Sequence, residues 1–414
     1  MSYIPPKPIL ERYASVLVDF ALGGGRGVQP GEIVRVASSE SAKPLYVELQ
    51  RAVWRAGGHV IGAYQPDDDG SYNLSRDFYE AATPEQLDFF PARHMRGLID
   101  EMDHQVSVIA DSDPHALDSV DPARIMRRGE AMRPMLDWRG AKENSGRFTW
   151  TLGLYGTPAM AAEAGMSVEE YWEQIIHACF LDSGDPLARW REVGRQLDET
   201  RARLDALEIE RLHVEGEDVD LWVTIGEQRR WLGGRGRNIP SFELFTSPDW
   251  RGTEGWIYCN QPLYRYGNLV RGIRLTFSGG LVTEATAEEN ERVLTEMIAT
   301  KGADRVGEFS LTDRRFSRIT RFMAHTLYDE NVGGSYGNTH IAVGRAYQDA
   351  YDGDPSELSD DQWEELGFNN SSVHTDIVST SDRVVTAKLR GGGERVIYQG
   401  GEFQLDLGPI AKTL

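Results

Sequence analysis

The amino-acid sequence predicts two successive domains, an N-terminal α/β domain and a C-terminal α+β domain. The first prediction rests on a regular alternation of strand and helix patterns in the N-terminal half. The second rests on a change near residue 208, after which short strands and hairpins predominate. A chain of 414 residues is also longer than a single hydrophobic core comfortably supports. We therefore expect an N-terminal α/β domain over residues 1–207 and a C-terminal α+β domain over residues 208–414.

The N-terminal half alternates short apolar strand patterns with amphipathic helix patterns. The expected strands are residues 32–38, 59–64, 106–110 and 147–153. The expected helices are residues 9–22, 43–56, 84–102, 122–136, 168–181 and 186–206. Because strands separated by such helices form parallel pairs, we expect an open, mainly parallel sheet with helices on both faces. The glycine-rich residues 23–27 follow a helix rather than a strand, so they are predicted to be a linker and not a phosphate-binding loop.

The C-terminal half mixes hairpins with short helices. The expected strands are residues 210–215, 218–226, 270–278, 280–284, 383–389 and 395–399. The expected helices are residues 287–301, 314–330 and 357–367. Glycine pairs and triplets separate several of these strands, which is typical of antiparallel hairpins. This order of elements predicts an α+β domain.

Composition narrows the range of functions. The formal net charge of -21 and the sequence pI of about 4.9 argue against nucleic acid and anionic membranes as partners. An ordinary solvated acidic surface explains this charge more simply than a field that attracts cations, although both interpretations remain open. The sequence lacks a membrane-length apolar run and a signal-peptide pattern, and it has only Cys179 and Cys259. We therefore expect a cytoplasmic protein.

Histidines and carboxylates in the C-terminal half form a candidate metal-binding set. Its members are Glu243, Glu308, His340, His374 and Asp376. Residues two apart on a strand face the same side, so His374 and Asp376 are predicted to converge on one point. Imidazole and carboxylate together suit zinc, cobalt, manganese or iron, and carboxylates can bridge two ions. Each residue alone has an ordinary alternative, since a single buried glutamate is more often an ion-pair partner.

Tyr347 is a further candidate. If a helix begins near His340, Tyr347 lies two turns later on nearly the same face, where its phenol could donate to a developing oxyanion. Tyr351 falls on that face too, so spacing does not decide between the two tyrosines. Packing of either aromatic ring in the domain core is the alternative interpretation.

Five short segments occur in an order that a known enzyme family shares. They are residues 29–34, residues 240–248 (PSFELFTSP), Gly307-Glu308, residues 340–344 with Tyr347, and residues 374–376. In these segments the chain resembles the aminopeptidase T/aminopeptidase S family of dinuclear metallo-aminopeptidases. The resemblance spans nearly the whole chain. It implies two metal ions bound by Glu243, Glu308, His340, His374 and Asp376, with Tyr347 at the site, in a homodimer.

The resemblance implies release of N-terminal amino acids from peptides by a metal-activated water, with peptides that have a free N-terminus as partners. Zinc, cobalt or manganese would serve as the two divalent ions, and Tyr347, Glu308 and Glu243 are the expected catalytic residues. One rival is a mononuclear Fe(II) ring-cleaving dioxygenase of the dihydroxypyridine type, for which two histidines and Asp376 would suffice. The other is a non-catalytic metal-binding scaffold. The presence of both glutamates favours the peptidase.

Overall fold

The computed structural model describes residues 3–68, 71–234, 236–265 and 268–405, and these divide into two compact units. The first unit comprises Met1–Glu192 and Arg235–Pro240. The second comprises Val193–Gly234 and Ser241–Leu414. No helix in the described part of the chain is both long and apolar enough to cross a membrane.

The first unit is built on a five-stranded sheet in the order β2-β1-β3-β4-β8. Its strands are β1 (Ile33–Ser39), β2 (His59–Gln65), β3 (His104–Ile109), β4 (Thr149–Leu154) and β8 (Asn238–Ile239). All neighbouring strands are parallel. The predicted parallel sheet is therefore confirmed, and the short strand β8 extends it at one edge.

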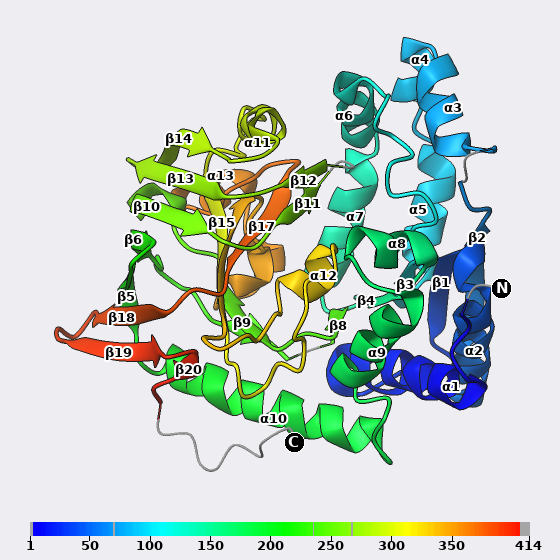
Figure 1. Ribbon diagram of the computed structural model, residues 1–414, viewed down its shortest axis with the longest axis horizontal. Coiled ribbons are helices and arrows are strands. Elements are labelled where there is room, and N and C mark those ends of the chain that lie inside the picture. The colour runs from blue at the N-terminus through cyan, green and yellow to red at the C-terminus, as the bar shows by residue number, and fades with distance from the viewer. Residues whose placement is uncertain (1–2, 69–70, 235, 266–267, 406–414) are drawn as a thin grey trace. The chain divides into compact units, whose positions relative to one another are not determined.

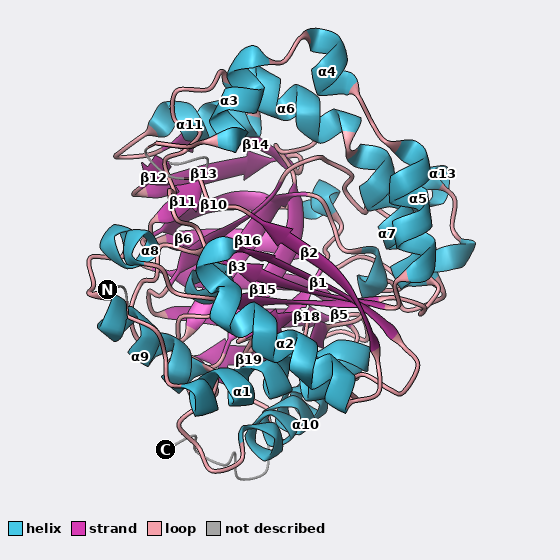
Figure 2. Ribbon diagram, turned by 90° about the vertical axis from the view of Figure 1, so that its right-hand side faces the viewer, coloured by secondary structure: helices cyan, strands magenta, loops and turns pink. Residues whose placement is uncertain are grey.

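Helices cover both faces of this sheet (Figure 2). On one face lie α1 (Lys7–Ser15) and α2 (Lys43–Arg55), and Gly153 of β4 leaves room for the side chains of Tyr13 and Leu17. On the other face, Ile99 of α5 (Ala92–Glu101) packs with Phe148, and Trp138 of α7 (Arg133–Asn144) packs against them. The remaining helices are α3 (Leu74–Ala81), α4 (Pro84–Asp88), α6 (Pro122–Ala131), α8 (Pro158–Glu163) and α9 (Val168–Ala178), and α10 (Pro186–Asp205) runs from the first unit into the second. This arrangement confirms the α/β fold.

Two predicted helices divide near prolines. The expected helix 84–102 separates into α4 and α5 just before Ala92, where Pro91 interrupts the pattern. The expected helix 122–136 separates into α6 and α7 at Met132, shortly before Pro134. Proline lacks the amide hydrogen that a continuous helix needs and restricts the residue before it, so helices commonly end there.

The second unit contains an eight-stranded antiparallel sheet in the order β14-β13-β10-β6-β5-β18-β19-β20, much of which is visible in Figure 1. Its strands are β5 (Ile209–Gly216), β6 (Val219–Thr224), β10 (Glu254–Cys259), β13 (Ile273–Ser278), β14 (Leu281–Thr286), β18 (Arg383–Leu389), β19 (Glu394–Gln399) and β20 (Glu402–Phe403). A two-stranded sheet pairs β11 (Leu263–Arg265) with β12 (Asn268–Val270). The α+β prediction is confirmed for this unit.

A second, five-stranded antiparallel sheet has the order β17-β16-β15-β9-β7. Its strands are β7 (Leu232–Gly233), β9 (Glu243–Thr246), β15 (Val306–Thr312), β16 (Asn338–Gly344) and β17 (His374–Ser379). Every residue of β9, β15 and β16 is buried, so the sheet is covered on both faces. Polar side chains on these strands consequently lie inside the protein.

The α-helices that lie wholly within the described part of the second unit are short. They are α11 (Glu291–Ile298), α12 (Thr326–Asp329) and α13 (Asp360–Glu365). The prediction of one helix over residues 314–330 is wrong, because only Thr326–Asp329 is α-helical. Side chains hold the preceding backbone instead: the Asp329 carboxylate accepts hydrogen bonds from the amides of Met323 and His325. Such bonds compete with a helical backbone.

Candidate metal centre

All five predicted metal ligands lie on one face of the sheet that contains β15 and β16. They are Glu243 on β9, Glu308 on β15, His340 on β16, and His374 and Asp376 on β17. The strand register explains this, because residues directly opposite each other share a face. Glu308 is opposite Ala342, which is opposite Asp376. Alternation along each strand then places the other three on that face.

The side chains converge closely. His340 Nε2 is 3.2 Å from an oxygen of Glu243 and 3.2 Å from Glu308 Oε1. His374 Nε2 is 3.8 Å from Glu308 Oε2 and 3.5 Å from Asp376 Oδ1. Two groups have possible ligand atoms that all lie within 4.8 Å of one another, one of Glu243, Glu308 and His340 and the other of Glu308, His374 and Asp376. Glu308 belongs to both groups and offers one oxygen to each histidine.

Both histidines are oriented through the ring nitrogen that faces away from the cluster. His374 Nδ1 lies 2.7 Å from the carbonyl oxygen of Arg345, to which it donates. His340 Nδ1 lies 3.3 Å from Asn338 Oδ1. A histidine that binds a metal usually donates its other ring N–H to a carbonyl or carboxylate oxygen, which fixes the tautomer. Here the same pattern leaves both Nε2 atoms directed at the carboxylates.

The cluster concentrates negative charge in the interior. Glu243, Glu308 and Asp376 are all less than a tenth exposed. Burial raises the pKa of Glu308 to about 7, and the neighbouring carboxylates add to this rise. Burial opposes protonation of His340, but its hydrogen bonds to Glu243 and Glu308 raise its pKa well above the usual value. The buried carboxylates therefore favour positive charge between them. Bound divalent cations would supply that charge.

The pKa of the His374 imidazole is raised, whereas the pKa of the Asp376 carboxyl is lowered. Although burial opposes it, the neighbouring carboxylates raise the pKa of His374 to about 9. Burial likewise opposes ionisation of Asp376, yet His374 lowers the pKa of that carboxyl to about 2. The carboxylate is thus ionised throughout the neutral range and is a ready metal ligand. The mixed nitrogen and oxygen donor set fits zinc, cobalt or manganese.

Sequence reasoning missed one acidic residue of this cluster. Glu330 is buried, and burial raises its pKa well above the usual value, with Glu243 and Asp376 contributing. It follows α12 in the segment wrongly predicted as one long helix. Asn331 links it to the site, because its side chain donates to Glu330 and accepts from the amide of Phe242. The only sequence signal for Glu330 was its place in the polar run of residues 329–331. The sequence pattern did not show that this run is buried.

Tyr347 lies beside the cluster, but the predicted helix beginning near His340 is wrong. His340 stands in the middle of β16, where its backbone pairs with β15 and β17. The chain leaves that strand at Gly344, and Tyr347 precedes a short 3-10 turn. The Tyr347 ring is 4.9 Å from the His374 ring, whereas Tyr351 packs against Trp363. Sequence spacing did not decide between these two tyrosines, but in the structure only Tyr347 of the two has its ring against His374.

Comparison with known proteins is consistent with this centre. Residues 7–403 match the family described as thermophilic metalloprotease (M29). The chain belongs to the M29 metalloprotease family. The resemblance predicted from the sequence is confirmed, and membership of this family makes the chain a hydrolase of the metallo-aminopeptidase class, which requires a divalent metal.

Several relatives of this M29 protein are similar over nearly their full length. Aminopeptidase T of Thermus aquaticus is 32% identical over an alignment of 406 positions, and the match covers 92% of this chain and 95% of the relative. Aminopeptidase T of Thermus thermophilus is 30% identical over 407 residues, covering 93% and 96%. Aminopeptidase PepS of Streptococcus thermophilus is 26% identical over 423 residues, covering 96% and 98%.

Two solved structures resemble the M29 chain to different degrees. The structure of wild-type AmpT from Thermus thermophilus has a TM-score of 0.80 at 27% identity and covers 96% of this chain and 100% of its own. The 2,5-dihydroxypyridine dioxygenase of Pseudomonas putida has a TM-score of 0.50 at 13% identity, with coverage of 97% and 98%. The second likeness concerns the fold alone.

Proposed function

We propose that the chain releases N-terminal amino acids from peptides at a site that holds two divalent metal ions. Glu243, Glu308 and His340 would hold one ion, and Glu308, His374 and Asp376 the other. The observation that carries this proposal is the position of Glu308, whose two oxygens lie 3.2 Å from His340 Nε2 and 3.8 Å from His374 Nε2. A carboxylate shared in this way is suited to bridge two ions about 4 Å apart.

Bound divalent ions supply Lewis acidity at such a site, which activates a water molecule and polarises the scissile carbonyl. The protein's own groups then orient the reaction. Ser310 Oγ donates to Glu243 Oε2 at 2.8 Å and holds that carboxylate in place. Glu243 is the candidate group to accept and return a proton during the reaction, while Glu308 would serve as the shared ligand.

Tyr347 is the proposed oxyanion donor. Its ring packs between Phe245, at 5.5 Å, and His374, at 4.9 Å, so the phenol is held next to the ligands of the second ion. The backbone of Tyr347 is fixed as well, because its amide donates to Ser247 Oγ at 2.8 Å. A donor positioned before the reaction stabilises developing negative charge without the cost of reorganisation.

The dioxygenase alternative has weaker support. A mononuclear iron site would need only the two histidines and Asp376. It would leave Glu243 and Glu308, both buried and within 3.2 Å of His340 Nε2, without a role. Buried carboxylates are costly unless they are paired or bind a metal. A non-catalytic scaffold likewise leaves the placement of Tyr347 unexplained.

Hydrolysis of a panel of aminoacyl-p-nitroanilides by the purified chain tests the proposal. Turnover should vanish with a chelator, return with zinc, cobalt or manganese, and be absent in Glu308→Gln. The matched control is Glu284→Gln, an exposed glutamate of β14, which should retain full turnover. Oxygen uptake with Fe(II) and a dihydroxylated ring, in place of peptide hydrolysis, would establish the dioxygenase.

Assembly as a homodimer and location in the cytoplasm stay predictions of the sequence and of its resemblance. Light scattering after size-exclusion chromatography tests the first, with a mass near twice 46.4 kDa expected. Cell fractionation tests the second. Peptides with a free N-terminus are the proposed substrates, while nucleic acid and membranes are not expected to bind.

A further inference from the structure

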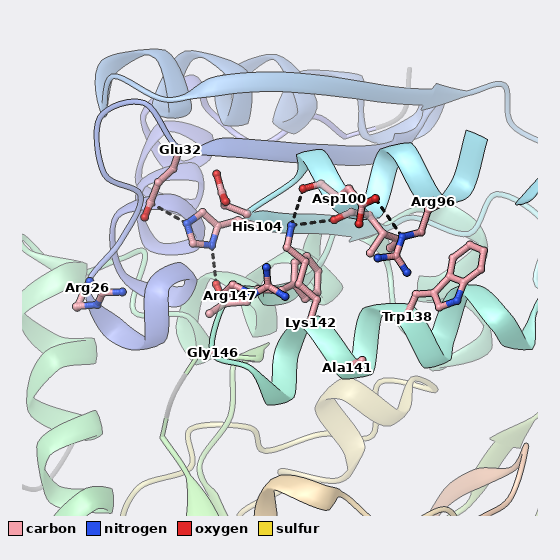
Figure 3. A pocket seen from close by; sticks show the side chains of 14 residues that line it. Arg26, Glu32, Arg96, Asp100, His104, Trp138, Ala141, Lys142, Gly146 and Arg147 are labelled. Carbon is pink, nitrogen blue, oxygen red and sulfur yellow. Dashed lines mark hydrogen bonds and ion pairs between the residues drawn. The ribbon is translucent and has the colours of Figure 1, made fainter. Parts of the chain in front are cut away.

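The first unit contains a cavity of about 480 Å³ at the edge of its sheet where the strands begin (Figure 3). Glu32, just before β1, and His104 and Thr149, the first residues of β3 and β4, lie along this edge. Ligands of open α/β sheets usually bind at the opposite edge, beyond the carboxyl ends of the strands. The proposed metal ligands all belong to the second unit and contribute nothing to this cavity.

The cavity wall carries charges of both signs. Four cationic side chains line it together with three acidic ones. These are Arg26, Arg96, Lys142 and Arg147, and Glu32, Asp100 and Asp103. In a chain of formal net charge -21, this local excess of positive charge is unusual. A site with these walls disfavours a polyanion, because of its three carboxylates, and disfavours a simple cation, because of its arginines.

Several of these groups are already engaged within the protein. The Lys142 ammonium donates to the carbonyl oxygens of Ile99, Asp100 and Met102 at 2.8–3.0 Å. Arg96 donates to the Asp100 carboxylate at 3.0 Å. Lys142 and the Arg96–Asp100 pair therefore build the wall and leave little capacity for a ligand.

Other polar groups on the wall remain available. Arg147 uses Nε to bond Ser145, and Arg26 uses Nε to bond the carbonyl oxygen of Gly23. Their terminal guanidinium nitrogens have no acceptor among the residues that the structure describes. Asp103 accepts the amide of Ile33 with Oδ2, and within the same described residues its Oδ1 receives no hydrogen bond. The cavity wall therefore offers a ligand both guanidinium donors, from Arg147 and Arg26, and a carboxylate acceptor, from Asp103.

One part of the wall is apolar. Ile99 is buried in a cluster with Met102 and Phe148, and Trp138 packs against that cluster. Arg96 lies over the Trp138 ring, 5.4 Å from its centre. Figure 3 shows Trp138 on the opposite side of Lys142 from Glu32 and Arg26. Arg96 and Asp100 lie beside Trp138 in the same view, but they are paired with each other, so this end of the cavity offers a ligand mainly the aromatic ring.

We propose that this cavity binds a small zwitterion with an apolar side chain, the chemical class of free amino acids and dipeptides. The ligand's carboxylate would bond Arg147 or Arg26, its ammonium would bond Asp103, and its side chain would pack against Trp138. The volume lies within the usual range for small-ligand sites, roughly 300–1,000 Å³. Given the proposed function, on which this last step rests, such a ligand belongs to the same chemical class as the reaction products.

Equilibrium dialysis of labelled L-phenylalanine against the chelator-treated full chain tests this site without using turnover. Saturable binding of one equivalent is expected, and a Phe-Leu dipeptide run in parallel distinguishes the two sources of the ligand. N-acetylphenylalanine lacks the ammonium and phenylalaninamide lacks the carboxylate, so each should bind at least about tenfold more weakly, since each loses a charge-assisted hydrogen bond. Inorganic phosphate should not compete.

Two variants and a control identify the cavity as the binding site. Arg147→Ala removes a donor, and Ala141→Phe fills the cavity without removing a contact, so both should reduce binding at least about tenfold. Arg93→Ala, on the same helix as Arg96 but outside the cavity lining, should bind like the parent chain. Absence of saturable binding, unchanged binding in both cavity variants, or equal competition by phosphate would overturn the proposal. Hydrolysis of aminoacyl-p-nitroanilides by the metal-loaded chain is measured separately. Failure of the proposed binding site can therefore be told apart from failure of the proposed peptidase function.

Discussion

At the scale of single residues, Glu308 determines how the centre is organised. It is buried, it is shared by both candidate ligand groups, and it directs one oxygen toward each histidine. The two histidines are in turn oriented by oxygens outside the cluster, the Arg345 carbonyl and the Asn338 side chain. The geometry is therefore held by hydrogen bonds that do not depend on the metal ions, as expected of a preorganised site.

The tyrosine beside the cluster gives a test at this scale. Tyr347→Phe removes a phenol next to His374 but keeps the ring that packs on Phe245. If the phenol stabilises the oxyanion, kcat for an aminoacyl-p-nitroanilide should fall about 100-fold or more with little change in metal content. Tyr351→Phe is the matched control, since Tyr351 packs on Trp363 in the core, and it should keep its kcat. An unchanged kcat in Tyr347→Phe would contradict the oxyanion role.

His325 gives a prediction about stability and pH. Burial lowers its pKa to about 4, and its Nδ1 accepts the amide of Leu327 at the start of α12. Because the folded-state pKa lies below the unfolded value of about 6.5, the neutral ring stabilises the fold above pH 6.5, and this contribution is lost as the pH falls toward 4. Between pH 7 and pH 5 the loss is about 1–2 kcal/mol.

Urea unfolding of the parent chain and of His325→Asn at both pH values measures this loss. Asparagine keeps an acceptor for the Leu327 amide but does not titrate, so the variant should lose about 1–2 kcal/mol less between pH 7 and pH 5. Identical pH dependence in the two proteins would show that His325 is not buried in its neutral form.

At the scale of elements, β9, β15, β16 and β17 bring together residues that lie more than 130 positions apart in the sequence. The register of β15 on β16 shifts between Val306 and Glu308, at Gly307. A Cβ atom on Gly307 would lie 2.4 Å from the carbonyl oxygens of Gly344 and Arg345. The absence of a side chain therefore permits the close approach that sets Glu308 in line with its partners.

Gly307→Ala tests the importance of this approach. Its methyl group meets backbone on both sides, so the free energy of unfolding should fall by about 1–3 kcal/mol, and metal affinity should fall as Glu308 moves. Gly391→Ala, in the turn between β18 and β19, is the control, because a Cβ atom there meets nothing within 4 Å. Denaturant unfolding and metal content measure both effects. A Gly307→Ala protein as stable and metal-rich as the control would refute this role.

Elements were predictable from the sequence where local pattern and final contacts agree. β1, α2 and β2 follow their patterns within a residue or two, because strand alternation and helix periodicity both reflect burial in a parallel α/β sheet. The segment 314–330 was not predictable in this way, since its backbone is held by the side chain of Asp329. The five proposed metal ligands were predicted from short motifs and resemblance, whereas Glu330 has no motif and is recognised only through its burial.

At the scale of the whole molecule, the acidic charge makes a prediction about salt. A net charge of -21 repels itself in the compact state. Raising sodium chloride from about 0.1 to about 1 M shortens the Debye length from about 10 to about 3 Å, so Tm should rise by a few degrees. At pH 5, near the sequence pI of about 4.9, the rise should disappear. A Tm that falls with salt at pH 7 would mean that surface ion pairs outweigh the repulsion.

The central claim is that one shared carboxylate organises two metal ions into a peptide-cleaving centre. The most direct test is titration of the metal-free chain with zinc, cobalt or manganese, while bound metal and hydrolysis of an aminoacyl-p-nitroanilide are measured on the same samples. We expect binding to saturate at two equivalents of metal per chain and full activity to require both. Glu308→Gln should not bind the second equivalent. Saturation and full activity at a single equivalent would contradict the account.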